Sequence, residues 1–474
     1  MKSTFTESPK DYSAVLNNIA ISYANLGLYE CAEQYHIESL KISESIMGHS
    51  LPETAAYLSN LGWLYVLSKS YERAEQYFIS AHQVHKNKYL SSLTYLGESQ
   101  RKLYWNMFSG FFNNNCLQFV YRYYFTKPSI STFAYNNELF RKGLLLSSSD
   151  AIRRSVLESG DNTLIAQYNE LTSIKQMVMT IEEKDPLSPS LKQLRHQADS
   201  LEKIITASSA AYRENQAMWQ ITWDSVQNHL SSNDVAIEYF SAPLSEDSTM
   251  YCALLLRHEN QYPELIPLFE EKEVSSYLST SNGNITNQSY DYYSNGDTIS
   301  KLVWSKILPK IKEGETIYFA PSGLLHQLAI EYLPYDENRT MSDVYNMVRL
   351  SSTREIVLNK QKTEYTTATI YGGIQYNLAA DNLVVESEKY PKIGLQATRS
   401  IENDTLNRGY VQYLPGTKKE AEKINALLQQ NNISVQLYTT AEANEESFKS
   451  LSSKHNNIIH VGTHGFTWTD STAR

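Results

Sequence analysis

The sequence contains few cysteines and no excess of basic residues. Its three cysteines, Cys31, Cys116 and Cys252, lie far apart without any C-x-x-C spacing, so they predict neither a disulfide framework nor a zinc knuckle. The net charge is -10 at pH 7, and no stripe of Lys and Arg interrupts this acidic balance. We therefore expect no direct binding to nucleic acid, because contact with the phosphate backbone requires clustered positive charge.

Long apolar runs are also missing. No segment approaches the roughly 20 apolar residues of a membrane span, and the N-terminal segment carries polar and acidic positions throughout, unlike a signal peptide. We therefore expect a cytoplasmic protein that does not enter the membrane. The composition, with 41% hydrophobic and 20% charged residues, is ordinary for a folded protein, and the 474 residues leave room for about three domains.

An internal repeat with an offset of 42 residues lies near the N-terminus. The sequence LNNIA at 16–20 returns as LSNLG at 58–62, and AEQY at 32–35 returns at 74–77. Small residues at the end of the first motif, followed by a tyrosine, suit two helices that pack closely against each other. The repeat therefore predicts two helix-turn-helix units over residues 12–88.

These positions resemble the tetratricopeptide repeat, in the longer variant found in kinesin light chains. The resemblance implies a groove for a protein or peptide ligand, with Asn18, Tyr23, Asn60 and Tyr65 as candidate contacts; a structural spacer remains an equal alternative. Two repeats alone bury little continuous core, since such arrays usually need about three units. Either the following helices cap them or further repeats precede them.

Residues 89–229 are predicted to form a helical linker or lid. Apolar and aromatic residues recur there at three- and four-residue spacings, which is typical of helices packed on a core. Besides the segment from Leu90 to Tyr124, the predicted helices are Phe133–Gly143, Ala151–Leu157, Leu164–Ile181 and Leu191–Trp219.

Residues 230–474 are predicted to form a largely parallel sheet with helices on its faces, because short β-rich runs alternate with helical segments. The predicted strands are Val235–Phe240, Tyr251–Leu256, Glu264–Leu268, Thr316–Ala320, Thr369–Tyr371, Ser434–Tyr438 and Asn457–Val461. The predicted helices are Ile299–Leu308, Lys418–Leu428 and Glu445–Leu451. The Asn-, Ser- and Gly-rich segment Ser281–Asp297 is expected to be a loop.

The last predicted strand runs into a turn with the sequence Gly462-Thr463-His464-Gly465. Catalytic groups gather at the carboxyl edge of parallel strands, so His464 is the candidate general base, with Gly465 supporting the turn or an oxyanion position. On the local sequence alone, a structural histidine remains an alternative. A zinc site of His455, His460 and His464 is excluded, since His460 and His464 would lie about 13 Å apart along a strand.

Six ordered motifs resemble the CHAT domain, a caspase-like peptidase family that is related to separase and often follows tetratricopeptide repeats. They are IYFAPSGLL at 317–325, EYLP at 331–334, VRLSSTRE at 348–355, YGGI at 371–374, LPGT at 414–417 and IHVGTHG at 459–465. The resemblance implies a caspase fold in which His464 is half of a Cys-His dyad that cleaves a peptide bond. In this family the cysteine follows the histidine, after the next strand; in caspases the separation is roughly 50 residues.

None of the three cysteines lies at the position of the family's nucleophile, and ten residues follow His464. We therefore expect a C-terminally truncated chain that lacks the nucleophile and is inactive. The longer product would be a cysteine endopeptidase, activated by a partner bound to the repeats and acting on a polypeptide. A non-catalytic interaction scaffold is the alternative. We expect no cofactor or metal.

Several motif residues have simpler interpretations. Arg354, Glu355 and Glu331 could set specificity, but single charges are usually solvated or paired within the structure. Ser322-Gly323 is expected to form a turn, because a serine nucleophile would need a G-x-S-x-G elbow. Gly372-Gly373 lacks the wider pattern of a phosphate-binding loop.

Overall fold

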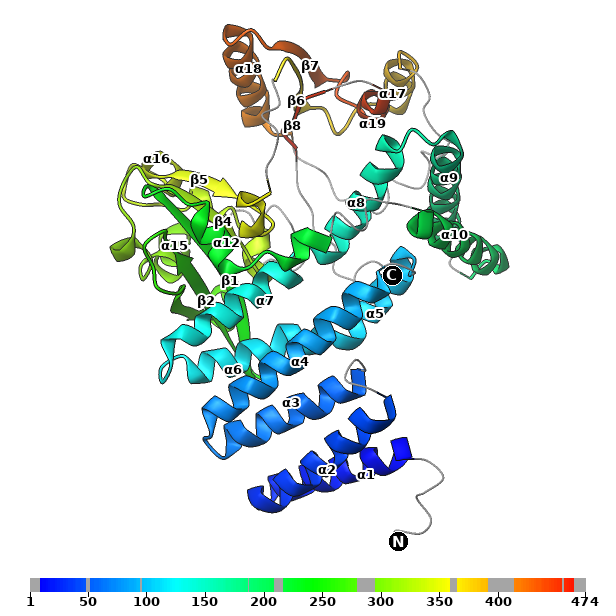
Figure 1. Ribbon diagram of the computed structural model, residues 1–474. Helices are drawn as coiled ribbons and strands as arrows, with labels where there is room; N and C mark the ends of the chain where they lie inside the picture. The colour runs from blue at the N-terminus through cyan, green and yellow to red at the C-terminus, as the bar shows by residue number, and fades with distance from the viewer. Residues whose placement is uncertain are drawn as a thin grey trace. The chain divides into compact units, whose positions relative to one another are not determined.

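The computed structural model describes nine stretches of the chain (Figure 1). They are residues 9–47, 52–93, 96–185, 187–208, 216–278, 295–358, 365–390, 413–453 and 456–463. The chain divides into two compact units. One contains Met1–Leu171 and Arg195–Asn359, and the other contains Thr172–Leu194 and Lys360–Arg474.

The predicted repeats form two helical hairpins, which confirms the helical N-terminal region. Their helices are α1 (Pro9–Asn25), α2 (Tyr29–Met47), α3 (Pro52–Leu67) and α4 (Tyr71–Ser92). The repetition extends to side chains: Tyr23 stacks on Tyr35 at 5.5 Å between ring centroids, and their equivalents Tyr65 and Tyr77 stack at 5.4 Å. Gly62 lets α4 approach closely, since a Cβ there would lie 2.9 Å from the Phe78 ring.

The helices after the second repeat pack against it, as the first of the two alternatives predicts. The chain continues through α5 (Glu98–Gly110), a π-helical turn (Phe111–Asn115) and α6 (Cys116–Tyr123). Phe78 of α4 stacks on Phe119 at 4.5 Å and lies 6.5 Å from Phe111. The second repeat therefore shares its core with the helices that follow.

The remaining helices agree with the predicted helical region, with changed ends. They are α7 (Ser131–Arg141), α8 (Leu144–Glu158), α9 (Asn162–Lys184), α10 (Pro189–Ser208) and α12 (Trp223–Asn228). Of the predicted helix 191–219, residues 191–208 belong to α10 and residues 216–219 to a separate 3₁₀ turn, Gln216–Gln220, and the residues between them are outside the described ranges. Within the described ranges, no helix has both the length and the apolar character needed to cross a membrane.

A five-stranded sheet belongs to the first unit. Its strands are β1 (Asp234–Ser245), β2 (Ser248–Leu256), β3 (Glu264–Glu270), β4 (Thr316–Ala320) and β5 (Asn346–Arg349), in the order β3-β2-β1-β4-β5. β1 pairs antiparallel with β2 and parallel with β4, and β5 continues the parallel side. Helices α13 (Glu271–Leu278), α15 (Gly296–Trp304) and α16 (Met341–Val344) lie between these strands in the chain.

A three-stranded parallel sheet belongs to the second unit. Its strands are β6 (Thr367–Ile374), β7 (Ser434–Thr440) and β8 (Ile458–Val461), in the order β7-β6-β8. The associated helices are α17 (Ala380–Ser387), α18 (Pro415–Gln430) and α19 (Glu445–Lys449). Helical repeats followed by one mixed sheet and one parallel sheet confirm the predicted α + α/β fold class. The boundaries 12–88, 89–229 and 230–474 remain predictions, and most of the expected loop 281–297 lies outside the described residues.

Candidate functional site

Three of the sequence motifs meet at the carboxyl edge of the three-stranded sheet. Gly372-Gly373 lies near the end of β6, Thr417 lies in the first turn of α18, and Gly462 follows β8. The backbone N–H of Gly462 donates to the Tyr371 carbonyl at 2.8 Å, and that of Gly373 donates to Thr417 Oγ1 at 2.9 Å. These bonds tie the segment that leads to His464 to the end of the central strand.

The glycines at this edge are required by close packing. A Cβ on Gly372 would lie 2.4 Å from the Thr417 carbonyl oxygen, and one on Gly462 would lie 3.1 Å from Thr417 Cβ. Gly373 adopts a φ of 61°, which disfavours other residues, and a Cβ there would lie 2.8 Å from Lys418 Cβ. The glycines thus let the first turn of α18 pack directly on the strand ends.

The described chain stops one residue before the predicted base. Thr463 is exposed, and its Oγ1 shares a hydrogen bond of 2.9 Å with the hydroxyl of Tyr376, which follows β6. His464 and Gly465 lie outside the described residues, so their roles remain predictions. What the geometry establishes is that β8 ends at the carboxyl edge of a parallel sheet, with Gly462 and Thr463 as the last described residues before His464.

His460 precedes this edge and has a carboxylate neighbour. Its Nε2 lies 3.3 Å from Glu420 Oε1 of α18. The two other histidines of the excluded zinc site, His455 and His464, are not among the described residues. Across the described ranges, no group of three or more His, Cys, Asp and Glu side chains is placed to hold a metal ion.

Two family models match the chain. A tetratricopeptide-repeat model matches residues 11–87, and a CHAT-domain model matches residues 294–473. This is a CHAT-domain chain with N-terminal tetratricopeptide repeats. The CHAT match begins after β1, β2 and β3, and it includes the edge formed by Gly372, Thr417 and Gly462. A comparison with curated proteins found no match.

Two of the three cysteines of the CHAT chain lie in environments that disfavour an ionised thiol. Cys116 and Cys252 are buried, and burial raises the pKa of both thiols, which opposes formation of the thiolate nucleophile. Cys31 is exposed on α2 of the first repeat.

The asparagines predicted to bind a partner differ in exposure. Asn18 is exposed on α1, whereas Asn60 is half-buried and donates from Nδ2 to Asn17 Oδ1 at 3.0 Å. Asn17 Oδ1 also lies 3.1 Å from His36 Nδ1. Asn60 therefore contributes to the packing of one repeat on the next, and Asn18 is the asparagine whose side chain is open to a ligand.

The two predicted tyrosines show a similar division. Tyr23 is half-buried, whereas Tyr65 is buried and its hydroxyl donates to Glu33 Oε1 at 2.6 Å. Burial, followed by this hydrogen bond, raises the pKa of Tyr65. The Arg73 guanidinium carbon lies 5.3 Å from the Tyr65 ring centroid. Tyr65 thus holds the repeats together, and its contact with a partner remains a prediction.

The CHAT motifs of the first unit contain residues that support the fold. Arg354 is only 2% exposed and donates to the carbonyls of Leu139 and Lys142, and Glu331 accepts from Arg349 at 2.6 Å. These contacts agree with the structural interpretation of both charges. The Ser322-Gly323 turn is also present, with a Gly323 φ of 56°.

The buried pair Glu238 and Lys142 was missed by the sequence analysis. Glu238 is fully buried in β1 and accepts from Lys142 Nζ at 2.6 Å. A glutamate inside the apolar run VAIEYF was the available signal, because a buried carboxylate needs a partner. The partner lies 96 residues away in the sequence, so no local pattern could identify it.

Proposed function

We propose that this CHAT chain is part of a cysteine endopeptidase in which His464 is the general base and partner binding to the repeats activates cleavage. The observation that carries the proposal is the convergence of Gly372, Thr417 and Gly462 at the sheet edge that leads to His464. The nucleophile would be a cysteine outside residues 1–474, because Cys116 and Cys252 are buried thiols with raised pKa values.

The chemistry follows from the properties of a thiol. A cysteine is only slightly ionised near neutral pH, and a neighbouring imidazole increases the thiolate fraction. The thiolate attacks the scissile carbonyl, the imidazolium protonates the leaving amine, and water then hydrolyses the thioester. Backbone N–H groups in the turn at Gly465 would stabilise the oxyanion, provided that they point to the developing charge.

The repeats provide the partner-binding part of the proposal. Tetratricopeptide repeats commonly bind other proteins, and Asn18 and the half-buried Tyr23 belong to the first repeat. A protein or peptide ligand would bind there, and a polypeptide would be the substrate of the CHAT domain.

The test uses the complete gene product and two histidines of the same segment. We expect His464→Ala to lower cleavage of the protein itself, or of a peptide library, by about 10³-fold, within the range for loss of a general base. His460→Ala is the matched control: it removes the imidazole beside Glu420 and should retain cleavage. Undiminished proteolysis by His464→Ala would contradict the proposal.

A non-catalytic scaffold is the second candidate, favoured by the burial and raised pKa values of the Cys116 and Cys252 thiols. The reading frame separates the two. A frame that continues beyond codon 474 with a Ser-Ala-Cys-like turn supports the peptidase, and a stop codon directly after Arg474 supports the scaffold.

A further inference from the structure

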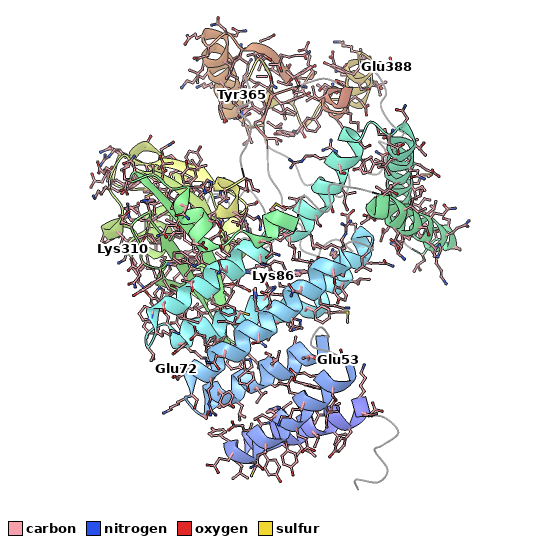
Figure 2. All side chains as sticks on the ribbon, in the orientation of Figure 1. Glu53, Glu72, Lys86, Lys310, Tyr365 and Glu388 are labelled. Atoms are coloured by element: carbon pink, nitrogen blue, oxygen red, sulfur yellow. The ribbon has the colours of Figure 1, made fainter. Side chains whose placement is uncertain are left out.

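A continuous set of buried contacts connects the second repeat to α7. The Lys86 ammonium of α4 (Figure 2) lies 5.4 Å from the ring centroid of Phe140, and the ring of His82 lies 6.0 Å from the same phenyl ring. Phe140 is 2% exposed and also contacts Phe112 at 5.1 Å. The last turn of α7 is therefore in direct contact with α4, so a change in the packing of α4 would alter its surroundings.

The same turn of α7 is held by Arg354 of the VRLSSTRE motif. The last carbonyls of a helix have no partner within the helix, and Arg354 donates to two carbonyls at this end, those of Leu139 and Lys142. The Arg354 guanidinium carbon lies 4.5 Å from the ring centroid of Trp219, whose ring in turn meets Phe140 edge-on at 6.3 Å. Arg354 thus contacts α7 in two ways. It donates to backbone carbonyls at the end of α7, and it is linked to Phe140 through the ring of Trp219.

The side chain of Lys142, at the end of α7, binds the five-stranded sheet. Its ammonium donates to Glu238 Oε2 at 2.6 Å, to the Tyr239 carbonyl at 2.7 Å and to the Ala320 carbonyl at 2.8 Å. These three acceptors use all three ammonium protons. They lie on β1 and on the last residue of β4, so one side chain ties α7 to both strands.

Glu238 connects Lys142 to the VRLSSTRE motif. Its Oε1 accepts from the Thr353 backbone N–H at 2.6 Å and from Thr353 Oγ1 at 2.8 Å, and the Ser352 hydroxyl donates to it at 3.1 Å. Residues 352–354 are therefore bound both through Glu238 and through Arg354. Removing one partner of a buried ion pair leaves the other charge uncompensated, which is strongly destabilising. We therefore expect these contacts to form or break together.

We infer that this cluster, defined by Phe140, Lys142, Trp219, Glu238 and Arg354, is a relay that couples the packing of the second repeat to the stability of β1, β4 and the VRLSSTRE motif. A ligand that changes the packing of α4 would thereby change the five-stranded sheet. The inference does not depend on peptidase activity, so it stands or fails independently of the proposed function.

The test is a double-mutant cycle read by hydrogen exchange on the whole chain. Gly62→Val perturbs the second repeat, because its side chain would collide with Phe78. With Arg354 present, we expect this change to accelerate exchange in the repeats and, by about fivefold, in peptides from β1 and β4. In an Arg354→Met background, the effect of Gly62→Val on the repeats should persist, while its effect on β1 and β4 falls below about twofold.

Two further variants keep the test decisive. Arg257→Met is the matched control: Arg257 directly follows β2 and binds Glu315, which directly precedes β4, at 2.7 Å, so its loss should destabilise the sheet and leave the fivefold transmission intact. If Arg354→Met does not fold, Arg354→Lys replaces it, because a lysine keeps the charge and loses the fork that reaches two carbonyls. Transmission to β1 and β4 that is equal with and without Arg354, or absent when Arg354 is present, would overturn the relay.

Discussion

The two sheets of this CHAT chain are stabilised in different ways. The five-stranded sheet buries charged groups, among them Glu238, Lys142 and Arg354, and binds them to each other and to the backbone. The three-stranded sheet is held by close backbone packing at Gly372 and by stacked rings, and its edge strand leaves Ile459 49% exposed. The five-stranded sheet is fastened to the end of α7 through Lys142, and the three-stranded sheet leaves part of its edge strand exposed.

This difference shows that the motif residues of one domain can have different roles. In VRLSSTRE, the buried Arg354 and Thr353 serve the fold, since their polar groups are used within the structure. In YGGI and LPGT, Gly372 and Thr417 bring a strand and a helix end together at the edge before His464. The presence of a charged residue in a motif is therefore weaker evidence for a catalytic role than the location of a motif at the carboxyl edge of the sheet.

The largest effect should come from breaking the buried ion pair of the first unit. Lys142→Met leaves the Glu238 carboxylate buried without its cation, so we expect a loss of about 3–5 kcal/mol in the free energy of unfolding. Urea unfolding followed by tryptophan fluorescence measures it. Lys127→Met, which breaks a partly exposed pair with Glu75, is the control and should cost less than about 1 kcal/mol. Equal losses in the two variants would mean that the buried ion pair is no more important for stability than the partly exposed one.

The next effect should be confined to the three-stranded sheet. Gly372→Ala places a Cβ 2.4 Å from the Thr417 carbonyl oxygen, so the first turn of α18 must shift, at a cost of about 1–3 kcal/mol. Hydrogen exchange should accelerate in β6 and α18. Gly416→Ala is the control, since its Cβ would meet no described atom within 4 Å apart from those of its chain neighbours and its own helix. Unchanged protection of α18 in Gly372→Ala would show that the close approach is not required.

Acid should destabilise the second repeat of the first unit through two buried histidines of α4. Burial lowers the pKa of His82 to about 3 and that of His85 to about 4, below the ordinary value of 6.5. Each folded-state pKa is depressed, so the associated stability is fully present above pH 6.5 and is lost as the pH falls towards 4. We expect a loss of about 2 kcal/mol per histidine between pH 6.5 and pH 5.

Hydrogen exchange at pH 7 and pH 5, corrected for the intrinsic rates, measures this loss in α4. His82→Gln should make the stability of α4 less dependent on pH. A pH dependence that is unchanged in this variant would mean that His82 is not the responsible group.

The smallest effect concerns the repeats alone. Tyr65→Phe keeps the ring stacked on Tyr77 and removes the hydroxyl that donates to Glu33, so we expect a loss of about 1 kcal/mol. Thermal unfolding measures it. Tyr23→Phe is the matched variant at the equivalent position of the first repeat. A larger loss in Tyr23→Phe than in Tyr65→Phe would contradict the assignment of Tyr65 as the residue that joins the repeats.

Much of the fold could be predicted because its signals are local. The 42-residue repeat places small residues at helix contacts, and the apolar runs at 235–240 and 251–256 lie within β1 and β2. β5 was missed because it is a four-residue edge strand with no fully buried side chain, so its sequence carries no clear alternation. The relay was missed because its members, such as Lys142 and Arg354, are separated by 212 residues.

The edge before His464 was partly predictable. The three strands were evident from their apolar and β-branched runs, whereas the turn is described only as far as Thr463, and β8 is less buried than a central strand would be. The reason for the glycines was not evident, since Gly372 and Gly462 are required by the first turn of α18, a segment distant in the sequence. Only the three-dimensional packing brings Thr417 to both of them.

The most direct test of the account is to map the adduct of a thiol-directed peptidyl probe on the complete gene product by mass spectrometry. The account predicts one modified cysteine outside residues 1–474, and loss of this modification in His464→Ala but not in His460→Ala. Specific modification of Cys31, Cys116 or Cys252, or labelling that persists without His464, would contradict it.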